Sequence, residues 1–232
     1  MRIVITGGSK GIGRAIADEF WRRGHQVLVC GQNKDELAAL AAAYDHQRFY
    51  TTVCNIQQLE QVEALLAKAL DCMGGVDIWL NNAGLANTTK SILDTTQTAL
   101  QSMVTTNVLG TMQCSRVAAK WMQQQGQGKI FTMLGGGSDG EYFAGMGIYG
   151  STKRALDYFT DALAKELAGS GVLVGKIRPG MIITEGVIRE SKADLANFER
   201  RRRLPTWSAM NPKPWHHSWW MPCCVAVKAV KR

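Results

Sequence analysis

Short apolar runs alternate with amphipathic segments from the start of the chain to about residue 178, and this alternation constrains the fold more than any other feature. The runs are almost continuously apolar, as the strands of a parallel sheet are when helices cover both of its faces. The segments between them repeat apolar residues at a helical spacing, which is typical of crossover helices. The sequence therefore predicts an α/β fold of three layers, in which a doubly wound parallel sheet lies between helices.

The predicted elements place six strands in one sheet, with the expected strand order 3-2-1-4-5-6. A chain of 232 residues is long enough for a single domain of this kind with one sizeable core. The predicted strands are 3–6, 26–30, 48–54, 76–81, 128–134 and 172–178, and the predicted helices are 11–23, 33–43, 57–72, 95–125 and 149–168.

The composition changes abruptly after Glu199. Residues 200–232 hold eight Lys and Arg and no Asp or Glu, and they contain four of the five prolines and four of the seven tryptophans. We therefore expect a folded domain over residues 1–199 and a basic, Trp- and Pro-rich tail of atypical composition over 200–232, in which only 223–227 resembles a strand. The tail is a genuine extension, a binding segment or an ending translated in an altered frame, and the abrupt loss of local patterning favours the last.

Charge, hydropathy and cysteine usage exclude several classes of protein. The whole formal charge of +8 comes from the tail, because residues 1–199 hold 19 bases and 19 acids. The domain itself therefore has no excess of positive charge, and we expect no nucleic-acid binding. No apolar run approaches the ~20 residues that span a bilayer, and a strand-like segment follows Met1 directly, so we expect no membrane span, no signal peptide and a cytoplasmic location. Six cysteines without C-x-x-C spacing predict core thiols and no metal site.

A glycine-rich turn over residues 6–14 follows the first predicted strand and leads into the first predicted helix. Glycine adopts backbone conformations that other residues avoid, and it lets main-chain N–H groups approach a pyrophosphate at the positive end of the following helix. The turn and its place in a strand–helix–strand unit predict a dinucleotide site in a Rossmann fold. The residues of this turn that we expect at the dinucleotide are Gly7, Ser9, Lys10, Gly11, Ile12 and Gly13.

The end of the second predicted strand indicates which dinucleotide binds. Residues 29–34 contain no acidic residue that would hydrogen-bond the ribose 2′-hydroxyl of NAD(H). Lys10 and Arg14 in the glycine turn supply positive charge for a 2′-phosphate. The sequence therefore favours NADP(H) over NAD(H), with Gln32 where a stronger phosphate ligand would be expected.

Tyr149 and Lys153 are four residues apart, so they share one face of a predicted helix. A nearby ammonium favours the phenolate form of tyrosine and brings its pKa closer to the pH at which it can exchange a proton with a carbonyl or alcohol oxygen. This spacing occurs by chance in many helices. The surrounding motifs therefore decide what it means.

Those motifs follow one another in the order typical of a single enzyme family. They are the glycine turn, Asn81-Asn82-Ala83-Gly84, Asn107 within 106–110, Ser138, the pair Tyr149 and Lys153, and Arg178-Pro179-Gly180 with Thr184. Over residues 1–199 the chain resembles the short-chain dehydrogenase/reductase family. The resemblance implies an NAD(P)-dependent oxidoreductase that transfers hydride to or from a small-molecule carbonyl or alcohol substrate.

The resemblance also implies a role for each site residue. Tyr149 would protonate the substrate oxygen, Lys153 would lower the Tyr149 pKa and hold the nicotinamide ribose, and Ser138 would hydrogen-bond the carbonyl. Asn107 would anchor a water relay behind Lys153. The other implied cofactor contacts are Asn82, Ala83 and Gly84 at the adenosine ribose, Asn55 at the adenine, and Pro179, Gly180, Ile182 and Thr184 at the nicotinamide.

Two features depart from the family pattern. Ser138 precedes Tyr149 by 11 residues where the family usually has about 13, and Gly136 stands at the usual position. The chlorophyll b reductase branch, which reduces a formyl group to a hydroxymethyl group with NADPH, has the same short spacing, a similar Gly-Ser-Asp-Gly block and Thr-Lys-Arg after the tyrosine. The chain resembles this branch over 135–154, which supports Ser138. The family also commonly closes with a seventh strand, which this sequence does not show.

Three functions remain open at this point. The intact set of catalytic residues favours an enzyme over an NADP(H) sensor without turnover, which would not need them. A third function is binding of acidic polymers or membranes through the tail, with the basic run 200–203 and the Trp- and His-rich segment 215–220. The family resemblance suggests a homodimer or homotetramer built on 95–125 and 149–168. The fold does not determine the substrate.

Overall fold

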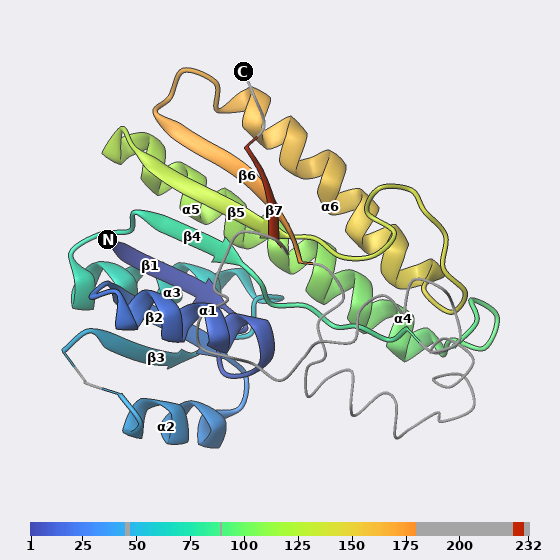
Figure 1. Ribbon diagram of the computed structural model, residues 1–232, viewed down its shortest axis with the longest axis horizontal. Coiled ribbons are helices and arrows are strands. Elements are labelled where there is room, and N and C mark those ends of the chain that lie inside the picture. The colour runs from blue at the N-terminus through green and yellow to red at the C-terminus, as the bar shows by residue number, and fades with distance from the viewer. Residues whose placement is uncertain (45–46, 89, 180–224, 230–232) are drawn as a thin grey trace.

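Six parallel strands form the centre of the molecule, in the order that the sequence predicts. The computed structural model describes residues 1–44, 47–88, 90–179 and 225–229. Over these residues the sheet has the order β3-β2-β1-β4-β5-β6-β7 (Figure 1). The parallel strands are β1 (Arg2–Thr6), β2 (Gln26–Gly31), β3 (Phe49–Val53), β4 (Ile78–Asn81), β5 (Gly128–Met133) and β6 (Val172–Pro179).

Helices cover both faces of the sheet, so the fold is the expected three-layer Rossmann fold in one domain. Those that pack on one face are α3, α5 and α6, and those on the other are α1 and α2. Their bounds are α1 (Gly11–Arg22), α2 (Lys34–Ala42), α3 (Leu59–Met73), α4 (Gln97–Val104), α5 (Thr111–Gln125) and α6 (Gly147–Glu166).

The sequence predicts one continuous helix over 95–125, and the structure divides this segment. A π-helical stretch, η1 (Thr105–Gly110), lies between α4 and α5. Such widened turns are frequently found at functional sites. This one contains Asn107, which is completely buried.

The seventh strand corrects the expectation that the sheet lacks one. Strand β7 (Val225–Ala229) pairs antiparallel with β6, with Val225 opposite Pro179 and Ala229 opposite Gly175. The strand-like segment 223–227 of the sequence begins two residues earlier and overlaps this strand at 225–227. The final part of the predicted tail therefore contributes an edge strand to the sheet.

Apolar residues fill the space between the sheet and the helices on each face. The face covered by α3 and α5 contains the largest fully buried side chain, Trp79 of β4. Its indole Nε1 donates to Asn81 Oδ1 at 3.0 Å, and Asn81 Nδ2 donates to Ser115 Oγ at 2.8 Å. The thiols of Cys30, Cys54 and Cys114 are buried in the same core.

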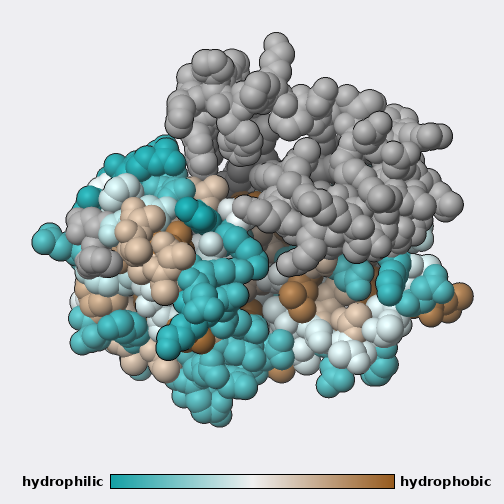
Figure 2. All heavy atoms as spheres, turned by 90° about the horizontal axis from the view of Figure 1, so that it is seen from below, coloured by the Kyte–Doolittle hydropathy of each residue, from teal (hydrophilic) through white to brown (hydrophobic). Residues whose placement is uncertain are grey.

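On the face seen in Figure 2, hydrophilic side chains form the broadest areas and apolar side chains occur in small patches between them. Within the described residues, every helix is too short or too polar to cross a membrane.

Trp79→Ala tests the packing of this core. We expect the substitution to lower the free energy of unfolding by about 3–5 kcal/mol, since it leaves a cavity and removes the indole hydrogen bond. Urea denaturation measures the loss. The control is Leu173→Ala at a side chain that is 41% exposed, where we expect less than about 1 kcal/mol. Equal losses in the two variants would contradict the assignment of Trp79 to the centre of the core.

Candidate active site

The carboxyl ends of β1, β4 and β5 bring the predicted site residues together. Parallel strands end at the same edge of a sheet, and ligands of doubly wound folds bind there. The glycine turn follows β1, residues 82–84 follow β4, and residues 135–138 follow β5. Helix α6, which carries Tyr149 and Lys153, begins beside the last of these loops.

The glycine turn is fastened to the loop after β4. Gly7 has a φ of 65°, and a Cβ there would lie 2.7 Å from Ala83 Cα, so the position requires glycine. Asn82 Nδ2 donates to the carbonyl oxygens of Thr6 and Gly7, at 3.0 Å each. The Thr6 hydroxyl accepts the backbone N–H groups of Asn82 and Ala83, at 3.1 Å each. These bonds give the turn a fixed shape.

Helix α1 starts inside this turn at Gly11, so its first N–H groups lie at the site edge of the sheet. Gly13 is buried, and a Cβ there would collide with Asn82 Nδ2 and the Gly7 carbonyl oxygen. Ile12 packs against the core on the α1 and α2 face. The turn thus combines accessible backbone donors with close packing beneath them, as a pyrophosphate site requires.

Glu36 is a site residue that the sequence analysis missed. Its carboxylate accepts a hydrogen bond from Ser9 Oγ and pairs with Lys10 Nζ, at 3.1 Å each. Asn33 caps α2 by accepting the N–H groups of Asp35 and Glu36, which places Glu36 in the first turn of the helix. The sequence contains a signal for this residue: an Asn directly after the second strand caps the next helix, and an acidic residue follows in the first turn of that helix.

Gln32 and Asn55 connect the ends of β2 and β3. Gln32 Nε2 donates to Asn55 Oδ1 at 3.3 Å, and this oxygen also accepts the Gln57 N–H at 3.1 Å. The Asn55 N–H donates to Gln61 Oε1 at 2.7 Å. The two residues expected at the adenine end of the dinucleotide are therefore neighbours, next to the turn that carries Ser9 and Lys10.

Lys153 is the buried cation of the site. Only 5% of its surface is exposed, and its Nζ donates to the Met133 carbonyl oxygen at 3.0 Å. Burial lowers the pKa of Lys153 from its usual value of 10.5 to about 8. The same Nζ lies 5.7 Å from the centre of the Tyr149 ring. The structure therefore places the ammonium next to the phenol, as the four-residue spacing predicts.

Tyr149 lies against the loop after β5. A Cβ on Gly135 would collide with the Tyr149 hydroxyl, so the phenol occupies the space that a side chain at this position would need. Ser138 lies on the same loop, completely buried, and its Oγ donates to the Gly135 carbonyl oxygen at 2.6 Å. Gly135 is thus the common neighbour of Ser138 and Tyr149.

Asn107 joins three parts of the site. Its Oδ1 accepts the Leu85 N–H at 2.7 Å, while its Nδ2 donates to the Leu85 carbonyl oxygen at 2.9 Å and to Thr152 Oγ1 at 3.1 Å. Thr152 in turn donates to the Tyr149 carbonyl oxygen at 2.7 Å. A Cβ on Gly84 would lie 3.2 Å from Asn107 Oδ1 and 3.6 Å from Lys153 Nζ. Thr152 is a second residue that sequence reasoning missed.

Pro179 ends β6 at the same edge of the sheet. The remaining residues implied for the nicotinamide, Gly180, Ile182 and Thr184, lie outside the described residues, as do the basic run 200–203 and the segment 215–220.

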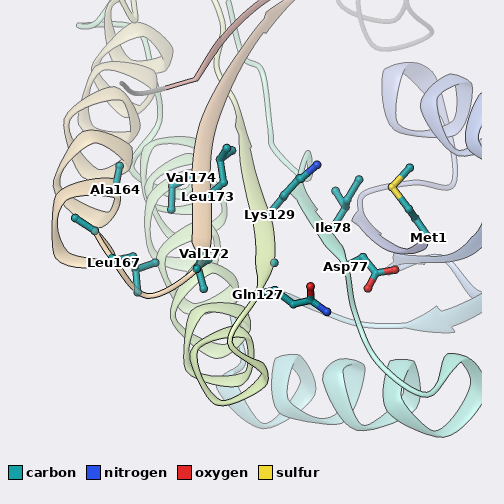
Figure 3. A pocket seen from close by; sticks show the side chains of 14 residues that line it. Met1, Asp77, Ile78, Gln127, Lys129, Ala164, Leu167, Val172, Leu173 and Val174 are labelled. Atoms are coloured by element: carbon teal, nitrogen blue, oxygen red, sulfur yellow. The ribbon is translucent and has the colours of Figure 1, made fainter. Parts of the chain in front are cut away.

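A hollow of about 460 Å³ lies at the opposite edge of the sheet, where β4, β5 and β6 begin (Figure 3). Apolar side chains such as Leu167 and Val174 line it together with Asp77 and Lys129. It contains none of the residues predicted for the site. The chemistry of this chain is therefore expected at the carboxyl edge.

The fold and this constellation agree with the comparison against protein families. The family model described as short chain dehydrogenase matches residues 1–194. The chain belongs to this family, as the sequence predicts.

Among curated proteins, the chain is 35% identical over 205 residues to the chloroplastic chlorophyll(ide) b reductase NOL of Oryza sativa subsp. japonica. The alignment covers 84% of this chain and 60% of that reductase, so the chain spans less than two thirds of the plant protein. Among solved structures, it is similar to the closed form of serine dehydrogenase complexed with NADP⁺, with a TM-score of 0.78, 26% identity and coverage of 88% and 82% of the two chains. It is also similar to ElxO with NADP bound, with a TM-score of 0.75, 28% identity and coverage of 82% and 77%.

Lys153→Met tests the buried ammonium. Because the folded-state pKa of about 8 lies below 10.5, the unfolded chain binds more protons between these values, and the stability of the wild-type chain rises from pH 8 to pH 10.5. We expect the variant to be more stable by about 1–2 kcal/mol at pH 7, with the difference closing toward pH 10.5, in urea denaturation. Lys68→Met, at a half-exposed position, serves as the control. A difference independent of pH would contradict the assignment.

Proposed function

We propose that the chain is an NADP(H)-dependent reductase that transfers hydride between the nicotinamide and a carbonyl or alcohol substrate. The observation that carries the proposal is the buried Lys153 ammonium beside the Tyr149 ring, at the edge of the sheet where the glycine turn lies. The glycine turn itself supports a dinucleotide, because Gly7 packs closely against Ala83 and helix α1 starts at Gly11 with its first N–H groups at this edge.

Each of four site residues has its own role in the proposed reduction. The nicotinamide, when bound, supplies the hydride to the carbonyl carbon. Tyr149 gives its proton to the carbonyl oxygen, and Lys153, charged below pH 8 or so, favours the phenolate that this leaves behind. Ser138 donates a hydrogen bond to the substrate oxygen. Asn107 holds the Leu85 backbone and the start of α6 in place behind the pair.

A formyl group on a chlorophyll b-like pigment is the substrate that we propose within this class. The similarity to chlorophyll(ide) b reductase NOL supports it, together with the Gly-Ser-Asp-Gly block and the Thr-Lys-Arg that follows Tyr149. Related reductases of other carbonyls can share these segments, so a substrate panel has to include both pigments and simple aldehydes.

Positive charge in the glycine turn supports NADP(H) as the cofactor. Lys10 and Arg14 lie in or next to the turn, and similar solved proteins bind NADP. Glu36, however, already pairs with Lys10 and accepts from Ser9, so it competes with a 2′-phosphate for the same donors. The preference for NADP(H) would therefore be limited by Glu36.

The proposal includes a homodimer or homotetramer built on α4, α5 and α6. Exposed apolar side chains on this part of the chain support it, with Val104 at 41% exposure and Leu109 at 46%. The division into a catalytic domain over 1–199 and a tail over 200–232 is part of the same proposal. The cytoplasmic location stays a prediction, since the plant relative is a chloroplastic protein.

Tyr149→Phe tests the proton transfer. We expect kcat for NADPH-dependent reduction to fall by about 10²–10⁴, because the variant keeps the ring and loses the proton donor, while NADPH affinity stays within about threefold. Absorbance of NADPH with a panel of aldehydes, ketones and formyl pigments measures the rate. Tyr158→Phe, at a 77% exposed position of α6, is the matched control. Activity that survives Tyr149→Phe would reject the mechanism, and NADPH binding without turnover of any carbonyl would favour the sensor.

Glu36→Gln tests the cofactor preference. We expect the Kd for NADPH to fall about 3–5-fold and the Kd for NADH to change by less than about twofold, because only NADPH carries a 2′-phosphate that Ser9 and Lys10 would bind. Fluorescence titration measures both constants. Glu60→Gln on α3 is the control. An equal gain for both cofactors, or weaker NADPH binding, would contradict the role assigned to Glu36.

A further inference from the structure

The loop over residues 135–141 carries Ser138, and its position relative to Tyr149 needs an explanation, because only 11 residues separate the two. The loop makes one close backbone approach to α6. Gly137 has a φ of 81°, and a Cβ there would lie 2.7 Å from Gly150 Cα. The loop therefore touches the helix directly after Tyr149.

Arg154 fastens this loop to α6 from the helix side. It follows Lys153 in the sequence, and its Nη1 donates to the Ser138 carbonyl oxygen at 3.1 Å. The same nitrogen donates to Asp157 Oδ2 at 3.2 Å. One guanidinium thus holds the backbone of the serine and is itself held by a carboxylate one turn along the helix.

Arg178 fastens the loop from the sheet side. Its Nη1 donates to Asp139 Oδ2 at 2.9 Å, and its Nη2 lies 3.9 Å from Asp157 Oδ1. Lys176, on the same strand, pairs with Asp157 at 2.7 Å. Asp157, whose side chain is 16% exposed, is the partner shared by the helix and the sheet. Separate exposed pairs contribute little to stability, whereas a network with a shared, half-buried member fixes geometry.

We propose that Arg154 and Arg178 are positioning residues that fix the Ser138 hydroxyl relative to the Tyr149 phenol. They hold the carbonyl of Ser138 and the carboxylate of Asp139, and both contact Asp157. The backbone of the serine is restrained in this way, and its hydroxyl donates to the carbonyl oxygen of Gly135, the residue against which the Tyr149 hydroxyl lies. The inference rests on the proposed role of Ser138 in carbonyl reduction.

A double-mutant cycle tests whether Arg154 acts through Ser138. We expect Ser138→Ala to lower kcat about 100-fold and Arg154→Met to lower it about tenfold, each with NADPH affinity within about threefold. In the Ser138→Ala background, Arg154→Met should lower kcat by less than about twofold. Arg22→Met on α1, which also breaks an exposed i,i+3 pair, is the control. An equal loss in both backgrounds would mean that Arg154 only supports the helix, and would overturn the proposal.

Amide hydrogen exchange tests the same proposal without turnover. Asp139→Asn removes the charge that pairs with Arg178 and keeps an oxygen for the Glu141 N–H. We expect exchange in residues 138–141 to become about tenfold faster, with residues 7–13 unchanged. Asp71→Asn, which breaks the exposed pair with Lys68, is the control. Unchanged protection of the loop in Asp139→Asn would overturn the proposal, whether or not a carbonyl substrate is found. Faster exchange in this variant, combined with a wild-type chain that reduces no carbonyl, would overturn only the proposed reaction.

Discussion

The burial of one ammonium group organises the site. Lys153 Nζ is taken out of water against the Met133 carbonyl, and its pKa falls to about 8. A charge in that position is costly unless polar groups surround it, and the chain supplies the end of β5, the Tyr149 ring and the Asn107 amide nearby. The strands, the π-helical turn and the glycine-rich loops together keep these groups at one edge of the sheet.

The sequence alone predicts the elements that depend on local pattern. Buried strands appear in the sequence as continuous apolar runs, and helices as apolar residues that repeat at a helical spacing. These patterns predict the six parallel strands, and the right-handedness of crossover connections predicts their order in the sheet. The glycine turn and the Tyr149–Lys153 pair are predictable for the same reason, because each consists of residues close together in the chain whose geometry is set by a turn or a helix.

Contacts between segments far apart in the chain could not be predicted from the sequence. Glu36 reaches Ser9 and Lys10 only because β1 and β2 lie side by side, and Asn107 reaches the Leu85 backbone only because the loop after β4 lies next to η1. Strand β7 lies in a segment that shows no helical period and only a short strand-like piece, 223–227, and the sequence does not indicate that this piece pairs with the edge of β6.

The buried cysteines Cys30, Cys54 and Cys114 lie in the core near the carboxyl edge of the sheet, and their reactivity depends on local opening of this core. The hydrogen bond with Cys54, together with burial, raises the pKa of Cys30, and burial raises the pKa of Cys114, so these two sulfurs are poor nucleophiles while the core is closed. Cys30 ends the sequence of buried residues in β2 and Cys54 follows β3, on the two strands whose ends carry Gln32 and Asn55. An alkylating reagent can react with Cys30 and Cys114 only when the sheet separates from the helices on this face. The rate of alkylation would therefore report such openings, and a ligand that binds across these strand ends would lower it.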